Sequence, residues 1–149
     1  MRSNDEVGMS MTPSKVILYI TEEVARQGHD VNLPDGWERV AWMLHSWTYA
    51  FQRKNKTPTL ADICELGSRV EVHHNKAGFR TCNVMIGSQV CPPWERVVTL
   101  LETLLLEIDK GIEPLELYKE FQLIHPFRDG NGRSGKILLN WLNGSLDIP

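Results

Sequence analysis

Residues 125–136 are HPFRDGNGRSGK, a polar, cationic and glycine-dense segment between two stretches of apolar helical periodicity. Gly130 and Gly132 can adopt a positive φ at little cost. Successive N–H groups in such a turn form a concave anion site, and the helix that follows adds the positive end of its dipole. The segment therefore predicts a backbone turn that binds an anion such as a phosphate.

Side chains in the same segment supply further chemistry. Arg133 and Lys136 are three residues apart and would project from one side of the first helical turn. Asp129 is a hard oxygen ligand beside the expected phosphates, as a Mg²⁺ site requires. His125 can accept a proton near neutral pH. A phosphate cradle, a metal ligand and a base in one short segment indicate phosphoryl or nucleotidyl transfer.

Two widespread glycine motifs overlap this segment, and neither fits it. The spacing Gly130-x-Gly132-x-x-Gly135 matches the dinucleotide fingerprint, but that motif needs a βαβ unit and no second strand follows. The spacing from Gly130 to Lys136 matches most of a P-loop. Ile137 stands where a P-loop has its Mg²⁺-binding Ser or Thr, and the parallel sheet is missing.

Most of the chain has helical spacing of apolar residues, with one exception. Between Gly78 and Gly87 the residues Cys82, Val84 and Ile86 alternate with their neighbours at the period of a β-strand. A short hairpin or flap is therefore expected within a helical domain. The five tryptophans mostly lie on helical faces, so core packing is expected for them. Helices are expected to begin near Thr12-Pro13, Trp37, Thr57-Pro58, Pro92-Pro93 and Pro114, with a sixth after Gly132.

Length and composition bound the class of protein. The chain has 149 residues, of which 42% are hydrophobic, and its formal net charge is -3. These values favour one domain with a real core and argue against a generally basic nucleic-acid binder. Cys64, Cys82 and Cys91 form no CxxC pair, so neither a disulfide framework nor a Cys-rich zinc site is expected.

The ends and hydropathy of the chain suggest its location. The first ten residues are polar and acidic, unlike a signal peptide, and no apolar run approaches the length needed to cross a bilayer. We expect a cytoplasmic protein with no membrane partner, or one delivered to a host cytoplasm. Residues 1–32 are expected to form an N-terminal helix and connecting loop of the same unit as residues 33–149.

The run HPFRDGNGR at residues 125–133 resembles the signature of the Fic (Fido) family, His-Pro-Phe-x-Asp/Glu-Gly-Asn-Gly-Arg-x-x-Arg. The resemblance implies an all-α fold, namely a compact single-domain Fic-type helical bundle with a small β-hairpin flap over the site. The flap would be residues 78–87. Lys136 replaces the last Arg of the signature, which keeps the charge but loses the bidentate fork.

The resemblance also implies roles for the signature residues. His125 would deprotonate the hydroxyl of a target protein, Asp129 would hold Mg²⁺ on the nucleotide phosphates, and Phe127 would anchor the loop in the core. The implied reaction transfers AMP from ATP to a Ser, Thr or Tyr hydroxyl. The phosphate-binding residues would be Gly130, Asn131, Gly132, Arg133 and Lys136.

Alternatives remain beside this interpretation. The same site could transfer another nucleotide or a phosphate, or the chain could be a weakly catalytic binding module or half of a toxin–antitoxin pair. Many Fic proteins carry an inhibitory helix with the pattern Ser/Thr-x-x-x-Glu-Gly/Asn. In this chain only Thr103 and Glu107 have the Ser/Thr-x-x-x-Glu spacing, and Ile108 follows them. They lie within an amphipathic helix, so they are expected to belong to the core scaffold, and the chain is expected to lack its own inhibitor. A small antitoxin-like protein is therefore a possible partner, while the sequence leaves the oligomeric state unknown.

The flap is expected to bind the target by backbone pairing along an exposed edge. Arg80, at the entrance of the flap, is expected either to contact the nucleotide or the target or to be a solvated charge. The adjacent pair His73-His74 has no acidic partner at metal spacing, so a solvated loop is expected there. The docking residues would be Gly78, Phe79, Arg80, Asn83 and Val84.

Overall fold

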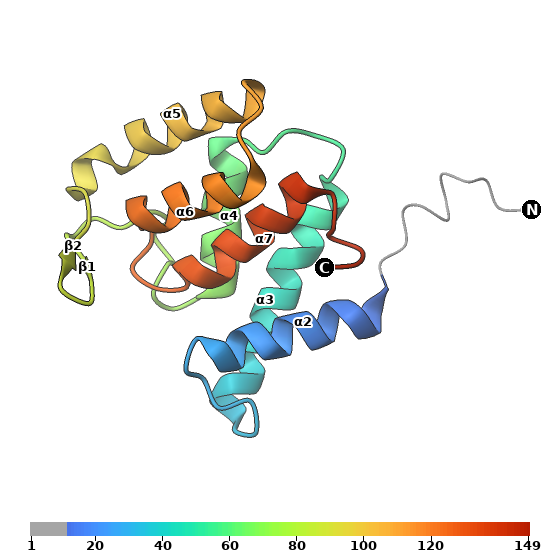
Figure 1. Cartoon of the computed structure of the whole chain (residues 1–149). Coiled ribbons are helices and arrows are strands. Elements are labelled where there is room, and N and C mark those ends of the chain that lie inside the picture. The colour runs from blue at the N-terminus through green and yellow to red at the C-terminus, as the bar shows by residue number, and fades with distance from the viewer. Residues whose placement is uncertain (1–11) are drawn as a thin grey trace, which may run out of the picture.

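The computed structural model of the chain describes residues 12–149. Within that range six α-helices surround a buried core, and one two-stranded hairpin projects from it (Figure 1). The predicted all-α fold with a small hairpin is confirmed. Of the predicted N-terminal segment 1–32, residues 1–11 lie outside the described part. The elements are α2 (Pro13–Arg26), α3 (Pro34–Gln52), α4 (Leu60–Val70), β1 (Met85–Ile86), β2 (Gln89–Val90), the 3₁₀ turn Trp94–Arg96, α5 (Val97–Asp109), α6 (Pro114–Ile124) and α7 (Asn131–Asn143).

Local sequence explains where the helices begin. A proline occupies the first turn of α2, α3 and α6, where its fixed φ suits the helix and its missing N–H costs nothing. Helix α4 begins later than the pair Thr57-Pro58 predicts. Its cap is Thr59, whose hydroxyl accepts from the Asp62 amide while the Asp62 carboxylate accepts from the Thr59 amide. This reciprocal capping box fixes the start at Leu60.

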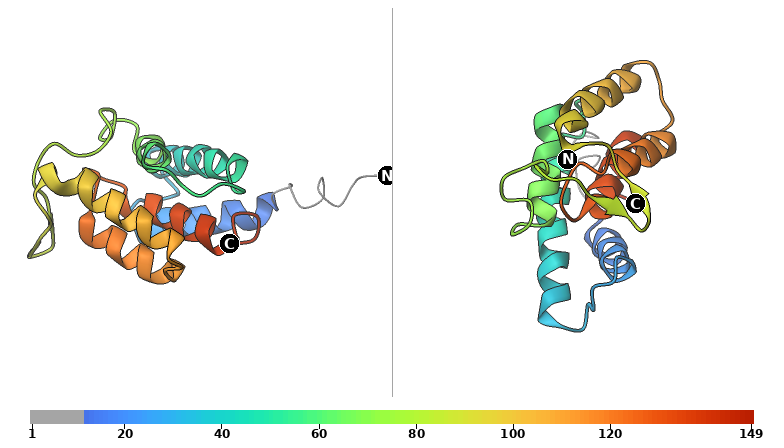
Figure 2. Two further views of the ribbon diagram at one scale, coloured as in Figure 1. Left: turned by 90° about the horizontal axis from the view of Figure 1, so that it is seen from above. Right: turned by 90° about the vertical axis from the view of Figure 1, so that its left-hand side faces the viewer.

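Helix α7 lies at the centre of the bundle and contacts α3, α4 and α6. Helix α2 packs on α3, and α5 packs on α6 along the opposite side (Figure 2). The loop that carries the signature residues therefore enters the core directly, because it connects α6 to the central helix. The largest fully buried side chains include Trp47, Met43, Phe121, Phe127, Ile63, Leu66, Leu101 and Ile137.

Four of the five tryptophans fall into two groups, and Trp42 is half-buried. Trp47 and Trp141 are buried, and their indole N–H groups donate to the carbonyl oxygens of Leu146 and Lys56. The side chains of Trp37 and Trp94 are 66% and 39% exposed, so the expected core role is wrong for both. Helical spacing placed Trp37 on an apolar face of α3, but no element of the described chain covers that end of the face.

None of the described helices has the length and apolar character of a membrane span.

The hairpin lies further along the chain than expected. Met85 pairs with Val90 and Ile86 with Gln89 in antiparallel register, and the turn between them uses Gly87 at φ +60°. Residues 78–84 are an irregular lead-in, so the predicted flap boundary of 78–87 is wrong at both ends. Gly87 makes the turn of the hairpin and does not end it. In Figure 2 the hairpin projects from one end of the bundle.

Candidate active site

The signature loop, residues 125–130, connects α6 to α7 and has a left-handed residue at each end. His125 follows α6 with a φ of +52°, and Gly130 precedes α7 with a φ of +74°. Among residues 12–149, His125 is the one non-glycine with a positive φ. Such a conformation is costly for a residue with a Cβ and persists when its surroundings fix it. The backbone at His125 is therefore held in place by other parts of the structure.

Arg80 supplies that support. Its Nε donates to the His125 carbonyl oxygen over 2.7 Å, and its Nη2 donates to the carbonyls of Ile124 and Pro92. The Arg80 side chain is 2% exposed, and its backbone N–H donates to the Pro126 carbonyl. The predicted contact of Arg80 with a nucleotide or target is corrected here, because its guanidinium is consumed by main-chain carbonyls.

Phe127 anchors the loop in the core, as predicted. Its side chain is fully buried, and a Cβ added at Gly67 of α4 would lie 2.0 Å from the ring. Gly67 is therefore needed for this close approach. Phe79 packs on the other side with its ring centroid 5.4 Å from that of Phe127. Phe79 is partly buried, so its ring helps to support the loop.

Asn131 closes the loop through its side chain. Its Oδ1 accepts from the Phe127 N–H and its Nδ2 donates to the Phe127 carbonyl, both over 2.9 Å. The first hydrogen bond of α7 is donated by Ser134 to Gly130, so the amides of Asn131, Gly132 and Arg133 have no acceptor within the helix. These three N–H groups are available to an anion. The expected set was Gly130, Asn131 and Gly132, but the Gly130 N–H donates to Oδ1 of Asp129.

Gly132 has a different role from the one its sequence position suggests. It lies in the first turn of α7 and has no positive φ, so of the two glycines only Gly130 is left-handed. A Cβ at Gly132 would lie 2.5 Å from Nε2 of Gln27. The C-cap residue of α2 thus lies against the first turn of α7, and the absence of a side chain at Gly132 permits this approach.

A small polar pocket of about 170 Å³ opens at this helix terminus. Two of its lining residues, Gln27 and His29, come from the α2–α3 connection and were missed by the sequence interpretation. The Gln27 amide donates to buried Glu23 over 3.0 Å, which fixes it at the rim. The remaining lining residues are His125, Arg128, Asp129, Gly130, Asn131, Gly132 and Arg133.

His125 is placed as a proton acceptor at the pocket. Its Nδ1 lies 3.3 Å from the Gln122 carbonyl oxygen, which can only accept, so Nδ1 carries the proton and Nε2 keeps its lone pair. Burial lowers the pKa of His125 from its ordinary value of 6.5, and the charge of Arg80 acts in the same direction. The imidazole is therefore neutral at pH 7.

The two cations of the signature helix diverge. The Arg133 side chain is 1% exposed and donates to the Val70 carbonyl and to Oε1 of Glu71, over 2.9 and 3.2 Å. Lys136 places its Nζ 4.8 Å from the ring centroid of Tyr118 and does not line the pocket. The expectation that both project from one side toward an anion is corrected, because α4 captures one side chain and α6 the other.

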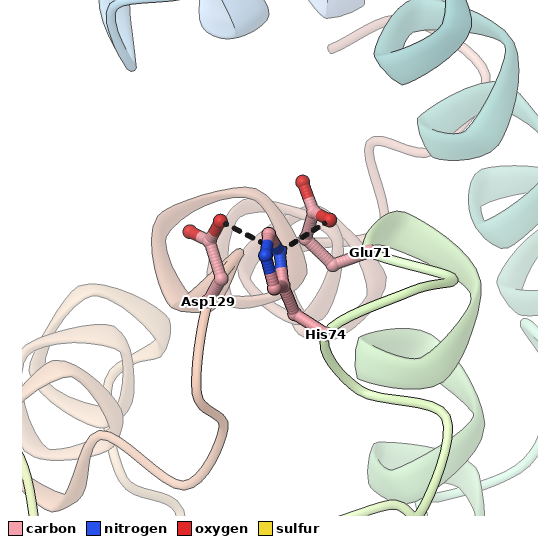
Figure 3. A group of neighbouring side chains, drawn as sticks. All are labelled: Glu71, His74 and Asp129. Atoms are coloured by element: carbon pink, nitrogen blue, oxygen red, sulfur yellow. Dashed lines mark hydrogen bonds and ion pairs between the residues drawn. The ribbon is translucent and has the colours of Figure 1, made fainter.

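The two carboxylate oxygens of Asp129 have different partners. Its Oδ1 accepts from the Gly130 N–H over 2.7 Å, and its Oδ2 lies 3.4 Å from Nδ1 of His74. The same Nδ1 is 3.0 Å from Oε2 of Glu71 (Figure 3). The expected solvated loop without an acidic partner is therefore wrong for His74. Two carboxylates meet it, one of them from a distant part of the chain.

The segment before the hairpin, residues 78–84, contains the remaining residues that were expected to dock the target. Asn83 accepts the Trp94 amide on its Oδ1, and the Val84 carbonyl accepts from Cys91. Gly78 has a φ of +92° and turns the chain toward Phe79. These residues position the hairpin, whose side chains at Met85, Ile86 and Val90 are exposed.

Comparisons with known proteins identify the family and the fold. The Fic/DOC family model matches residues 57–143, which is more than half of the chain, so the chain belongs to the Fic/DOC family. A Fic domain containing signaling protein from Bacteroides thetaiotaomicron has a similar structure, with a TM-score of 0.64 over 93% of this chain and 63% of that one. At 19% sequence identity this likeness shows the fold.

Two curated relatives carry the name protein adenylyltransferase. A probable protein adenylyltransferase from Aquifex aeolicus is 38% identical over 82 residues, which cover 48% of this chain and 26% of that protein. The protein adenylyltransferase Fic from Nematostella vectensis is 32% identical over 99 residues, which cover 59% of this chain and 23% of that protein. The match spans about a quarter of either relative.

Proposed function

We propose that this chain is a Mg²⁺-dependent protein adenylyltransferase, which moves AMP from ATP to a Ser, Thr or Tyr hydroxyl of a target protein. The observation that carries the proposal is the placement of His125. It lines a pocket formed by the N-terminus of α7, and its pKa is lowered by burial. A neutral imidazole beside an anion hole suits attack of a hydroxyl on a phosphate. The names of the two curated relatives support the same activity.

The proposed reaction balances as a single displacement. The target hydroxyl oxygen forms a bond to the α-phosphorus, and the bond from that phosphorus to the bridging oxygen breaks. Pyrophosphate leaves, and the hydroxyl proton passes to Nε2 of His125. The amides of Asn131, Gly132 and Arg133 would stabilise charge on the phosphate oxygens, since helix N-termini favour anions.

Asp129 is suited to hold Mg²⁺. Its carboxylate is 43% exposed at the pocket, and Gly130 fixes the orientation of Oδ1. Mg²⁺ in nucleotide sites takes one or two carboxylates and completes its shell with phosphates and water. Mg²⁺ bound there would neutralise phosphate charge. The chain's own contribution is to present one hard oxygen beside the anion hole.

The size of the pocket limits what it can enclose. Its volume of about 170 Å³ is smaller than the roughly 300–1,000 Å³ of sites that enclose a whole ligand. The phosphates would therefore occupy the pocket while the nucleoside lies outside it.

The exposed hairpin is the proposed docking element for the target. Met85 and Val90 are 57% and 70% exposed, and a two-stranded sheet keeps an unpaired edge on each strand. An extended target segment could pair with such an edge. Replacing residues 85–90 with a Gly-Ser linker should impair modification of a protein target and spare ATP binding. Equal loss of both activities, or of neither, would count against this role.

Transfer of another phosphate-containing group is a second candidate. It is favoured by the position of Lys136, which lies on Tyr118 outside the pocket. The second cation of the signature is thus not placed to select a triphosphate. UTP and other nucleotide donors should be compared with ATP in the same assay.

The test is parallel incubation of the chain and a cell lysate with ATP labelled either in the base or at the γ-phosphate. Label from the base alone is expected and means nucleotidyl transfer. Label from γ alone would replace the proposal with phosphotransfer. The His125→Asn variant serves as the control, because asparagine tolerates a positive φ but cannot act as the base. Equal labelling by this variant would overturn the proposed role of His125.

A further inference from the structure

Three potential ligand atoms converge where α4 ends beside the signature loop (Figure 3). Nδ1 of His74 faces Oε2 of Glu71 and Oδ2 of Asp129, and one ligand atom from each of the three residues lies within 4.8 Å of the others. The nitrogen lies 3.0 Å from the Glu71 oxygen and 3.4 Å from the Asp129 oxygen. One imidazole between two carboxylates is a donor set for a divalent cation.

Two of the three separations, those from His74, match neighbouring ligands around one metal ion. Nitrogen and oxygen ligands lie about 2.1 Å from Zn²⁺. Two such ligands are about 3.0 Å apart at a right angle and about 3.4 Å apart at a tetrahedral angle. The distances from His74 to Glu71 and Asp129 are therefore those of neighbouring positions in a coordination shell.

Glu71 is held for this role by two arginines. Its side chain is fully buried, and its Oε1 accepts from Arg39 Nε over 2.7 Å and from Arg133 Nη2 over 3.2 Å. Both cations therefore bind one oxygen, which leaves Oε2 directed at His74. A carboxylate fixed by such outer partners is a preorganised ligand.

Asp129 is fixed independently. The buried side chain of Asn75 donates to the Asp129 carbonyl over 2.7 Å and to the Gly67 carbonyl over 2.9 Å. The Gly130 amide occupies Oδ1 of Asp129, so Oδ2 is left to face His74. Each carboxylate thus has one oxygen committed to the protein and the other presented to the same nitrogen.

We propose that Glu71, His74 and Asp129 bind one divalent cation of intermediate softness, such as Zn²⁺ or Co²⁺. The nearby charges set this preference. Arg39 and Arg133 offset the two carboxylates, which weakens attraction for Mg²⁺ or Ca²⁺, whereas the imidazole favours metals that accept nitrogen. The His74 side chain is 52% exposed, so the cation can enter from solvent.

This site shares Asp129 with the proposed Mg²⁺-nucleotide contact. A cation held by all three residues would occupy the oxygen needed beside the phosphates. That consequence rests on the proposed function, but cation binding itself does not. It can be measured on the chain without nucleotide, so failure of the transfer assay and failure of metal binding are distinguishable.

The test is titration of the nucleotide-free full chain with Zn²⁺ by calorimetry and with Co²⁺ by visible absorption. All variants carry Cys82→Ser, which removes the exposed thiol as a competing ligand. We expect one ion per chain, a cobalt spectrum typical of nitrogen ligation, and no displacement by excess Mg²⁺. His74→Ala and Asp129→Asn should each weaken binding by about tenfold or more, since outer partners alone are worth that much.

His73→Ala is the matched control. His73 is the adjacent histidine, and its ring packs edge-on against Trp42 with centroids 5.3 Å apart. Its removal should leave the affinity and the cobalt spectrum unchanged. Circular dichroism checks that each variant is folded. Equal Zn²⁺ affinity in His74→Ala and the parent, or loss in His73→Ala instead, would overturn the proposal and leave His74 as a hydrogen-bond donor.

Discussion

The Nε of Arg80 donates to the main-chain carbonyl oxygen of His125 over 2.7 Å, although 45 positions separate the two residues. His125 has a left-handed backbone, and Arg80 also binds the carbonyl that precedes it, at Ile124. A buried cation in the lead-in to the hairpin thus fixes the turn that presents the imidazole. Its charge also lowers the pKa of that imidazole. Arg80 is a positioning residue for His125.

Arg80→Lys should uncouple this support while keeping the charge. A lysine cannot reach several carbonyls with one rigid fork. We expect kcat for transfer to fall more than tenfold with KM for ATP changed less than threefold, because the anion hole lies on α7. Steady-state kinetics measure the split. Arg96→Lys, at an exposed arginine, is the control, and equal changes in kcat and KM would indicate a general structural defect.

His125→Asn should abolish transfer and leave the fold intact. Asparagine accepts the left-handed conformation that His125 adopts, so little strain is added. A general base typically contributes roughly 10²–10⁴ in rate, and a loss of that size is expected. Thermal unfolding of the variant should stay within a few degrees of the parent. Near-parental transfer would remove His125 from the mechanism.

The pH dependence of kcat/KM should have an acid limb centred below pH 6.5. Burial and Arg80 lower the pKa of His125 from that value, so the imidazole stays neutral and active at pH 7. As the pH falls through the lowered pKa, protonation of His125 removes the base and the rate decreases. A pH–rate profile for the free enzyme checks this. An inflection above pH 6.5 would contradict the assignment.

Asn131→Ala should destabilise the protein through the signature loop. The change leaves the buried N–H and carbonyl of Phe127 without partners, at a cost of about 1–3 kcal/mol each. We expect a loss of about 2–5 kcal/mol in the free energy of unfolding, measured by urea denaturation. Asn143→Ala, at the exposed end of the same helix, is the control and should change stability by less than about 1 kcal/mol.

Lys136→Met should alter the KM for ATP by less than threefold. Its ammonium group lies over Tyr118 and outside the pocket, so it is not expected to contact phosphates bound in the pocket. Lys119→Met, on the exposed side of α6, controls for loss of a positive charge. A tenfold or greater rise in KM specific to Lys136 would show that this side chain leaves Tyr118 when the nucleotide binds.

The sequence by itself predicted the features that depend on residues close together in the chain. Helical spacing and proline positions predicted the helices, and the run from His125 to Arg133 identified the family before any contact was known. Phe127 was expected in the core, and it is there. The capping box of Thr59 and Asp62 is also a local pattern, and it predicts the start of α4 more accurately than Thr57-Pro58 does.

The tertiary structure decided which residues from distant segments meet. Arg133 and Lys136 are three apart on one helix, but α4 holds the first at Glu71 and α6 holds the second at Tyr118. Gln27 reaches Gly132 because the C-terminal end of α2 lies against the first turn of α7. His74 meets Asp129 because Asn75 ties its loop to the signature turn. The spacing of residues predicts which face of a helix a side chain lies on. It does not predict which residue of another helix that side chain contacts, because this depends on how the helices pack.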